Sequence, residues 1–258
     1  MTPQELDASP LDTARRLAEE GDLGGAAAIL TGLASDPEAP DRAQAAVGLA
    51  VVLDEQGDVR GARNAARSAL ATGHPEYAAQ AACHLAQGFE REGLDEQARG
   101  AWQAVLGLGT AAYLPVAHLA LARLAESDEE AEAHLRGALA AGGPISAAQQ
   151  LADLLLARGE PEEAVAVLEE TLEVCDEVAA AQVRVRLGIA HLELACAHFA
   201  VAVEEGRDRE TVSLAIELLA RTLPLRGRGD DAEQVWAYGL GHGDAELADQ
   251  VRLRHDRP

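Results

Sequence analysis

Three side chains in the carboxyl-terminal half of the chain could bind a metal ion, namely His191, Cys196 and His198. Imidazole and thiolate groups are the usual ligands of structural zinc. In a continuous helix, however, His191 and His198 lie two turns apart, about 10 Å at a rise of 1.5 Å per residue. Two ligands that each sit about 2 Å from one ion cannot be that far apart. We therefore expect no metal site here, and we expect His191 to pack in the core.

Sequence motifs for catalysis are missing. The chain has no glycine-rich phosphate loop, no HExxH, no GxSxG and no CxxC. Carboxylate pairs such as Glu162 and Glu163 fall where exposed helix starts are expected. We predict that the protein is not an enzyme, has no catalytic residues and needs no cofactor.

Cations gather near the carboxyl end, and every basic residue is arginine because the chain contains no lysine. Guanidinium groups bind carboxylates strongly, so this cluster could hold an acidic segment of a partner. Alternatively, it balances neighbouring acids and helix ends. Its members are Arg221, Arg226 and Arg228, with Arg252 and Arg254 as further candidates.

The net charge limits the possible partners. The chain has 44 acidic and 21 basic residues, a formal charge of −23. Binding nucleic acid requires cations that displace the counterions around phosphate, and anionic membranes attract basic segments. We therefore expect a protein or peptide partner, and neither nucleic acid nor membrane.

Targeting signals are not visible in the sequence. The first residues, MTPQELDASP, have no basic patch followed by an apolar stretch, and no window approaches the ~20 apolar residues of a membrane span. The three cysteines, Cys83, Cys175 and Cys196, are odd in number and widely spaced. This pattern fits reduced thiols, so we expect a cytoplasmic protein.

The core must be built from small and aliphatic side chains, because the chain has only seven aromatic residues. Strands would show period-two runs of β-branched and aromatic residues, which are scarce. Instead, one phrase recurs with Gly at its third place and Ala at its eighth. The eighth-place alanines, spaced by 36, 36, 33, 33, 31 and 37 residues, are Ala26, Ala62, Ala98, Ala131, Ala164, Ala195 and Ala232. Upstream of most of them stands Leu followed by a small residue, as in Leu49-Ala50, and downstream a small-then-large apolar pair, as in Ala69-Leu70.

This pattern resembles the tetratricopeptide repeat (TPR) family, a 34-residue helix-turn-helix with Leu-Gly in its first helix and Ala, then an aromatic residue, in its second. The resemblance implies an all-α fold, an α-solenoid (right-handed superhelix) of about seven antiparallel helical hairpins. These would cover residues 11–241, between an N-terminal tail (1–10) and a C-terminal capping helix and tail (242–258). The family's first-helix Trp is missing, and the second-helix aromatic survives only as Trp102, Phe199 and Trp236. An alanine-rich helical array of a neighbouring type is the alternative.

The turn residues suit this fold. Gly can take the left-handed conformation that ends a helix, and Asp22 and Asp58 can cap the helix that follows. The recurring Ala lies where two helices cross, and a larger side chain would separate axes that should lie ~8–10 Å apart. The turn glycines are Gly21, Gly57, Gly93 and Gly159.

Repeats four, six and seven depart from the pattern. Repeat four has lost its Gly, and Ser127 is a candidate N-cap for its second helix. In repeat six only eight residues separate Leu187 from Ala195, against thirteen between Leu49 and Ala62. We expect a shortened turn near Glu193 rather than two fused helices. In repeat seven, Pro224 should end the first helix.

The resemblance also implies that the first helices line a concave groove that holds peptides or partner helices. Amide side chains beside apolar patches suit such ligands. The alternative is that several of these residues pack between repeats. The family's carboxylate clamp is not expected, because its cationic positions hold residues such as Val47 and Cys83. The predicted groove residues are Gln44, Val47, Val51, Gln80, Cys83, Gln87, Leu121, Gln149, Asp153, Gln182, Val185, Ile189 and Arg221.

We therefore expect a non-catalytic scaffold that binds a peptide or helical segment. Two alternatives stay open. One is a self-associating structural subunit, because VRVRLGIAHLEL (183–194) is apolar nearly all round, and such helices are normally buried. The other is an accessory component of a biosynthetic enzyme complex.

Overall fold

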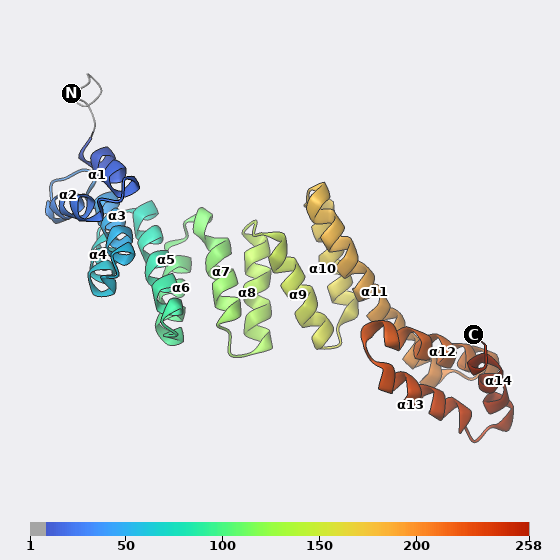
Figure 1. The fold of residues 1–258 in the computed structure, drawn as a ribbon. Helices are drawn as coiled ribbons and strands as arrows, with labels where there is room; N and C mark the ends of the chain where they lie inside the picture. The colour runs from blue at the N-terminus through green and yellow to red at the C-terminus, as the bar shows by residue number, and fades with distance from the viewer. Residues whose placement is uncertain (1–8, 258) are drawn as a thin grey trace. The chain divides into compact units, whose positions relative to one another are not determined.

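The computed structural model describes residues 9–257, which form helices and connecting turns without any strand. They divide into two compact units, of which the first ends at Ala147; Figure 1 labels the helices of both units. Its elements are α1 (Pro10–Glu19), α2 (Leu23–Ser35), α3 (Arg42–Glu55), α4 (Val59–Ala71), α5 (Pro75–Arg91), α6 (Asp95–Leu108), the short 3-10 helix η2 (Ala111–Tyr113), α7 (Leu114–Arg123) and α8 (Asp128–Ala140). Most of the predicted N-terminal tail, residues 1–8, lies outside the described residues.

The second unit begins at Ala148, inside α9. Its elements are α9 (Ile145–Ala157), α10 (Pro161–Val174), α11 (Glu177–Glu205), α12 (Arg209–Thr222), the 3-10 helix η3 (Leu223–Arg226), α13 (Gly229–Leu240) and α14 (Ala245–His255).

Most helices that are adjacent in sequence within a unit pack against each other, for example α1 with α2, α3 with α4, and α12 with α13. The predicted repeat of antiparallel helical hairpins is thereby confirmed, and the fold is all-α and TPR-like. The handedness of a superhelix stays a prediction.

The turns have the predicted chemistry. The four turn glycines have positive φ angles, as at Gly57 (79°), a conformation that other residues adopt only with strain. The Asp22 and Asp58 carboxylates accept hydrogen bonds from the backbone N–H groups of Gly25 and Gly61 and so cap α2 and α4. Without a turn glycine, repeat four still forms a hairpin, because Ser127 caps α8 as predicted.

The recurring alanines lie in the core where the repeat is regular. Five of them, Ala26, Ala62, Ala98, Ala164 and Ala232, are at most 5% exposed. The other two, Ala131 and Ala195, are only half-buried and belong to repeats four and six, which depart from the pattern. The recurring alanine is thus only half-buried in the two repeats where fewer than thirteen residues separate Leu from Ala.

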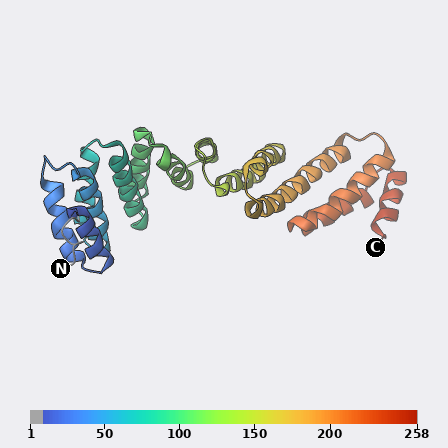
Figure 2. The same ribbon diagram turned by 90° about the horizontal axis from the view of Figure 1, so that it is seen from above.

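Repeat six contradicts one expectation. The shortened turn near Glu193 is wrong, because α11 is a single helix of 29 residues that runs through that position. Figure 2 shows it as one uninterrupted rod in the gold-to-orange part of the colour range. Between Leu187 and Ala195 only Gly188 disfavours a helix, and a single Gly costs about 1 kcal/mol in a helix interior. Eight residues leave too little chain to end one helix, turn and begin another.

In the carboxyl-terminal repeat the first helix ends just before Pro224, as predicted. α12 ends at Thr222, two residues before Pro224, and η3 and the turn at Gly227 lead into α13. The predicted capping helix is α14, whose Leu247 and Val251 pack on Val212 and Ile216 of α12.

Candidate functional site

Four predicted groove residues meet in the first unit. Gln44, Val47 and Val51 of α3 and Gln80 of α5 line a hollow of about 270 Å³, here called the first-unit hollow. Val47 is only 5% exposed and forms part of its floor, whereas Val51 and Gln80 are exposed. The first helices of neighbouring repeats therefore present apolar and amide groups to one depression, and its role in binding stays a prediction.

Residues of α1 that the sequence analysis missed complete this hollow. Leu11, Arg15 and Ala18 line it as well. The 36-residue spacing between Ala26 and Ala62 puts Leu11 and Arg15 at the positions of Val47 and Val51, but the predicted groove residues began only with the second repeat.

Two predicted groove residues are wrong as contact positions. Cys83 is 7% exposed and Leu121 is 1% exposed, and both belong to a core cluster around Trp102. Burial raises the pKa of the Cys83 thiol to about 11, so the group stays neutral. These side chains hold repeats together, the alternative that the sequence left open.

The remaining first-helix candidates are at least partly accessible. Gln87, Asp153, Gln182 and Val185 are exposed, and Gln149 and Ile189 are half-buried. Asp153 of α9 forms an ion pair with Arg186 of α11, which joins two first helices of the second unit. Val185 is 66% exposed, an unusual value for a large apolar side chain.

The carboxyl-terminal arginines are paired within the chain. Arg221 contacts Glu217 at 3.2 Å and donates hydrogen bonds to the carbonyl oxygens of Arg254 and Arg257. Arg254 also contacts Glu217, at 2.9 Å. The partners of Arg226, Arg228 and Arg252 are Glu193, Asp231 and Asp249. This supports the view that the cluster balances neighbouring acids.

The expectation that His191 packs in the core is wrong. His191 is exposed rather than packed in the core, because the continuous α11 turns this position toward solvent. His198 is exposed as well. Within residues 9–257 no three His, Cys, Asp or Glu side chains are placed to hold a metal ion.

The two halves of α11 bury opposite sides. Val178 and Cys196 are eighteen residues, or five turns, apart and therefore point the same way. Val178 is 78% exposed, whereas Cys196 is 5% exposed and packs on Leu219 and Leu223. In the first half the buried side chains are Ala180, Val183 and Ala190, on the other side of the helix, and this half packs against α10. The second half packs against α12.

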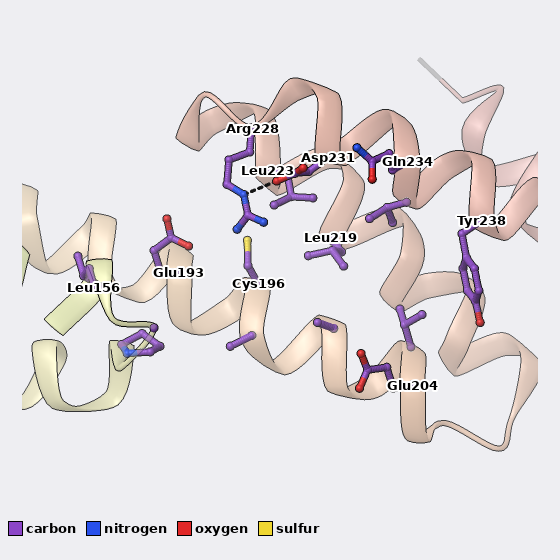
Figure 3. A pocket seen from close by; sticks show the side chains of 16 residues that line it. Leu156, Glu193, Cys196, Glu204, Leu219, Leu223, Arg228, Asp231, Gln234 and Tyr238 are labelled. Carbon is purple, nitrogen blue, oxygen red and sulfur yellow. Dashed lines mark hydrogen bonds and ion pairs between the residues drawn. The ribbon is translucent and has the colours of Figure 1, made fainter.

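A second, larger depression lies beside the second half of α11. This α11–α13 cleft has a volume of about 620 Å³ and is lined mainly by α11 and α13, with Leu156 and Pro161 at the α9–α10 turn (Figure 3). Cys196, Ala197, Ala200 and Val203 of α11 form much of its floor. Gln234, Val235 and Tyr238 of α13 form the opposite wall.

The charged groups of the α11–α13 cleft are mostly paired. Glu193 contacts Arg226 at 2.7 Å, and Arg228 contacts Asp231 at 2.6 Å, which raises the pKa of the Arg228 guanidinium. Burial, followed by the charge of Glu193, raises the pKa of the Cys196 thiol. Glu204 lies toward the same end of the cleft as Tyr238 (Figure 3) and has no cationic partner within residues 9–257.

Helix α11 also bears on the membrane question. By length and composition alone, it is the one helix within residues 9–257 that could cross a membrane, with a mean hydropathy of 1.4 over 18 residues. This contradicts the expectation that no window is apolar enough. Glu193 lies near its middle and is paired with Arg226, and a carboxylate at the bilayer centre is costly. Helix α11 contacts α10 and α12, and 11% of its apolar window is buried.

No family model matches the sequence, and no curated protein matches it. Among solved structures, a tetratricopeptide repeat protein from Parabacteroides merdae is 16% identical, with 96% of this chain and 98% of that chain covered and a TM-score of 0.48. BtubC (BKLC) from P. vanneervenii is 16% identical, with 96% and 90% covered and a TM-score of 0.43. A putative kinesin light chain from Podosopora anserina, with nearly identical TPR-like repeats, is 16% identical, with 96% of each chain covered and a TM-score of 0.34.

The helices of this chain define its fold by themselves. Helical hairpins packed in sequence order, with a buried alanine at the recurring position in five repeats, give the described residues an all-α, TPR-like fold.

Proposed function

We propose that the protein is a non-catalytic scaffold that binds a peptide or helical segment of a protein partner on the first helices of its repeats. The observation that supports this proposal best is the first-unit hollow, where Val47, Val51, Gln44 and Gln80 surround one depression of about 270 Å³. Apolar contacts supply affinity there, and the amides fix the position of a ligand by hydrogen bonds.

The hollow suits a preformed site. Its walls are helices whose side chains are fixed by packing, for example Leu30 at 5% and Val52 at 5% exposure. Binding to a rigid surface leaves the ordering cost mainly with the partner, which favours affinity.

The test compares two substitutions of equally exposed valines. Val51 lines the hollow and is 38% exposed, whereas Val116 on α7 is 39% exposed and lies outside it. Partners captured from the native cell by the intact chain should be lost with Val51→Glu and kept with Val116→Glu. Equal recovery of partners by both variants would show that the hollow is not the binding site.

Self-association is a second candidate, favoured by one specific observation. Val178 and Val185 form an uncovered apolar stripe on the first half of α11, at 78% and 66% exposure. Exposed apolar stripes on helices commonly pair with a partner helix. Light scattering at tens of micromolar should then show a dimer that Val178→Glu/Val185→Glu dissociates, and a monomeric intact chain would exclude this candidate.

A further inference from the structure

The α11–α13 cleft occupies the place of a missing helix. In the first unit the second helices of the first two repeats, α2 and α4, are in contact. The second helix of repeat six would lie between α10 and α13, but its residues continue α11 instead. The cleft is bounded by Pro161 at the start of α10 and by Val235 and Tyr238 of α13. Its position therefore matches one absent helix.

The walls of the cleft favour a helix over an extended peptide. The side chains that line α11 and α13 follow helical spacing, as Glu193, Ala197, Ala200 and Glu204 show. Backbone N–H and C=O groups inside these helices already bond within the helix, so none is free to pair with a strand. A helix satisfies its own backbone and needs only side-chain contacts.

The floor of the cleft permits a close approach. Cys196, Ala197 and Ala200 are small, and helix axes can come within ~8–10 Å where small side chains meet. The stretch from Glu193 to Glu204 measures about 16 Å at 1.5 Å per residue, so it accommodates about three turns. The regular second helices of the chain have 13 or 14 residues.

The carboxylates of the α11–α13 cleft indicate that the ligand carries a cationic side chain. Three carboxylates line the cleft, and two of them, Glu193 and Asp231, are paired with arginines of the chain. The third, Glu204, has no cation within the described part, residues 9–257. A cationic side chain on the ligand would pair with Glu204. The net charge of −23 also steers cationic partners toward the chain.

From this geometry we infer that the α11–α13 cleft binds an amphipathic helix of about three turns from a protein partner. The apolar face of that helix packs on Ala197, Ala200 and Val235. A Lys or Arg that flanks this face pairs with Glu204. The site is separate from the first-unit hollow and does not depend on the function proposed for it.

The probe is a displayed library of helical peptides of about 14 residues on an alanine-rich frame. Ala, Val, Leu and Phe vary at one face, and Ala, Glu, Lys and Arg vary at the flanking positions. Selection against the intact 258-residue chain should enrich an apolar face flanked by Lys or Arg. The enriched sequence, labelled with fluorescein, then gives a Kd by anisotropy.

Two matched Ala→Trp substitutions locate the site. Ala197 and Ala181 are both exposed on α11, but only Ala197 lines the cleft. Ala197→Trp should weaken binding by at least about tenfold because the indole fills the cleft, whereas Ala181→Trp should change it by less than about twofold. Thermal melting of both variants verifies that they fold.

A double-mutant cycle tests the charge. Glu204→Gln should weaken binding of the cationic peptide by about two- to fivefold, the usual strength of an exposed ion pair. The same substitution should not affect a peptide whose Lys or Arg is replaced by Gln.

Several results would overturn the inference. These are an empty selection, enrichment of Glu instead of Lys or Arg, and equal binding to the two Trp variants. Self-association that only Ala197→Trp abolishes would show that a second copy of the chain fills the cleft instead.

Discussion

Repeats four and six have both lost the turn glycine, yet only repeat four still folds back on itself. Repeat four keeps twelve residues between Leu119 and Ala131, and Ser127 caps its second helix. Repeat six keeps eight between Leu187 and Ala195, and its two helices merge into α11. The comparison teaches that the length of the connecting segment, more than its glycine, decides whether a hairpin forms.

The merger has consequences that the first unit does not show. In the first three repeats the recurring alanines are buried, and the first helices share a small hollow. Where the hairpin is missing, Ala195 is half-buried, Val178 is exposed, and a larger cleft opens beside α13. A repeat that is shorter by about one turn segment thus leaves exposed surface where complete hairpins have packed surface.

Restoring the missing length should have the largest effect. Insertion of DEQGD, copied from residues 54–58, between His191 and Leu192 returns the Leu187–Ala195 spacing to thirteen. We expect a hairpin, because the insert supplies a Gly for positive φ and an Asp for the next cap. Hydrogen exchange followed by mass spectrometry should show fast exchange in the insert. Five inserted alanines serve as the control and should stay protected as helix; equal protection of both inserts would contradict the role of turn chemistry.

A Trp at a helix crossing should have a smaller effect than the insertion. It should lower the free energy of unfolding more in a complete hairpin than in repeat six. Ala62 is 2% exposed, so Ala62→Trp should lower the free energy of unfolding by ~1–3 kcal/mol. Ala195→Trp should cost less, because Ala195 is half-buried and has room on one side. Urea denaturation measures both, with exposed Ala181→Trp as the reference. A larger loss at Ala195 than at Ala62 would reverse the proposed difference between the repeats.

Two glycine substitutions should have opposite signs. Gly57 has φ of 79°, and Gly57→Ala should destabilise by about 1–2 kcal/mol because an L-residue is strained there. Gly188 lies inside α11, and a Cβ added to it would meet no atom of a neighbouring segment within 4 Å, so Gly188→Ala should stabilise by about 0.5–1 kcal/mol. Denaturation midpoints give both values. Destabilisation by Gly188→Ala would indicate that α11 bends or turns at this residue.

The smallest expected effect concerns pH. In the first unit His118 and His134 face each other with 3.2 Å between their Nδ1 atoms, near Glu130 and Arg99. Burial and, for His118, the neighbouring imidazole lower the pKa of both groups below 6.5. The unfolded chain then binds more protons, so stability falls as pH drops through 6.5 toward the folded-state values.

Replacing one member of this pair should flatten that dependence. His134→Asn removes a group that resists protonation, so urea denaturation at several pH values between 7 and 5 should show a shallower loss of stability. Gln182→Asn at an exposed position, which alters no titratable group, is the control. An unchanged slope in His134→Asn would mean that the pair does not govern it.

Most of the fold could be predicted from the sequence, because its cause is local. Turn glycines, aspartate caps and crossing alanines each act within one hairpin, and their spacing is visible in the chain. The fusion in α11 was visible only as a short spacing, and the choice between a tight turn and a continuous helix depends on the competition between helix propensity and packing. Sequence alone did not settle that competition.

The candidate sites were less predictable, because exposure depends on neighbouring repeats. The frame selected Gln44, Val51 and Gln80, which line one hollow, but it also selected Cys83 and Leu121, which adjacent helices bury. The α11–α13 cleft was missed because it results from an absent helix. His191 was assigned to the core for the same reason.

The most direct test is a distance along α11. Spin labels at Val178→Cys and Val201→Cys, both exposed positions, are introduced after Cys83→Ala, Cys175→Ser and Cys196→Ala remove the native thiols. A continuous helix places the two backbone sites about 35 Å apart, since 23 residues rise by 1.5 Å each. A distance near 35 Å by double electron–electron resonance would support a continuous α11. A distance below about 20 Å would show that repeat six folds back as a hairpin.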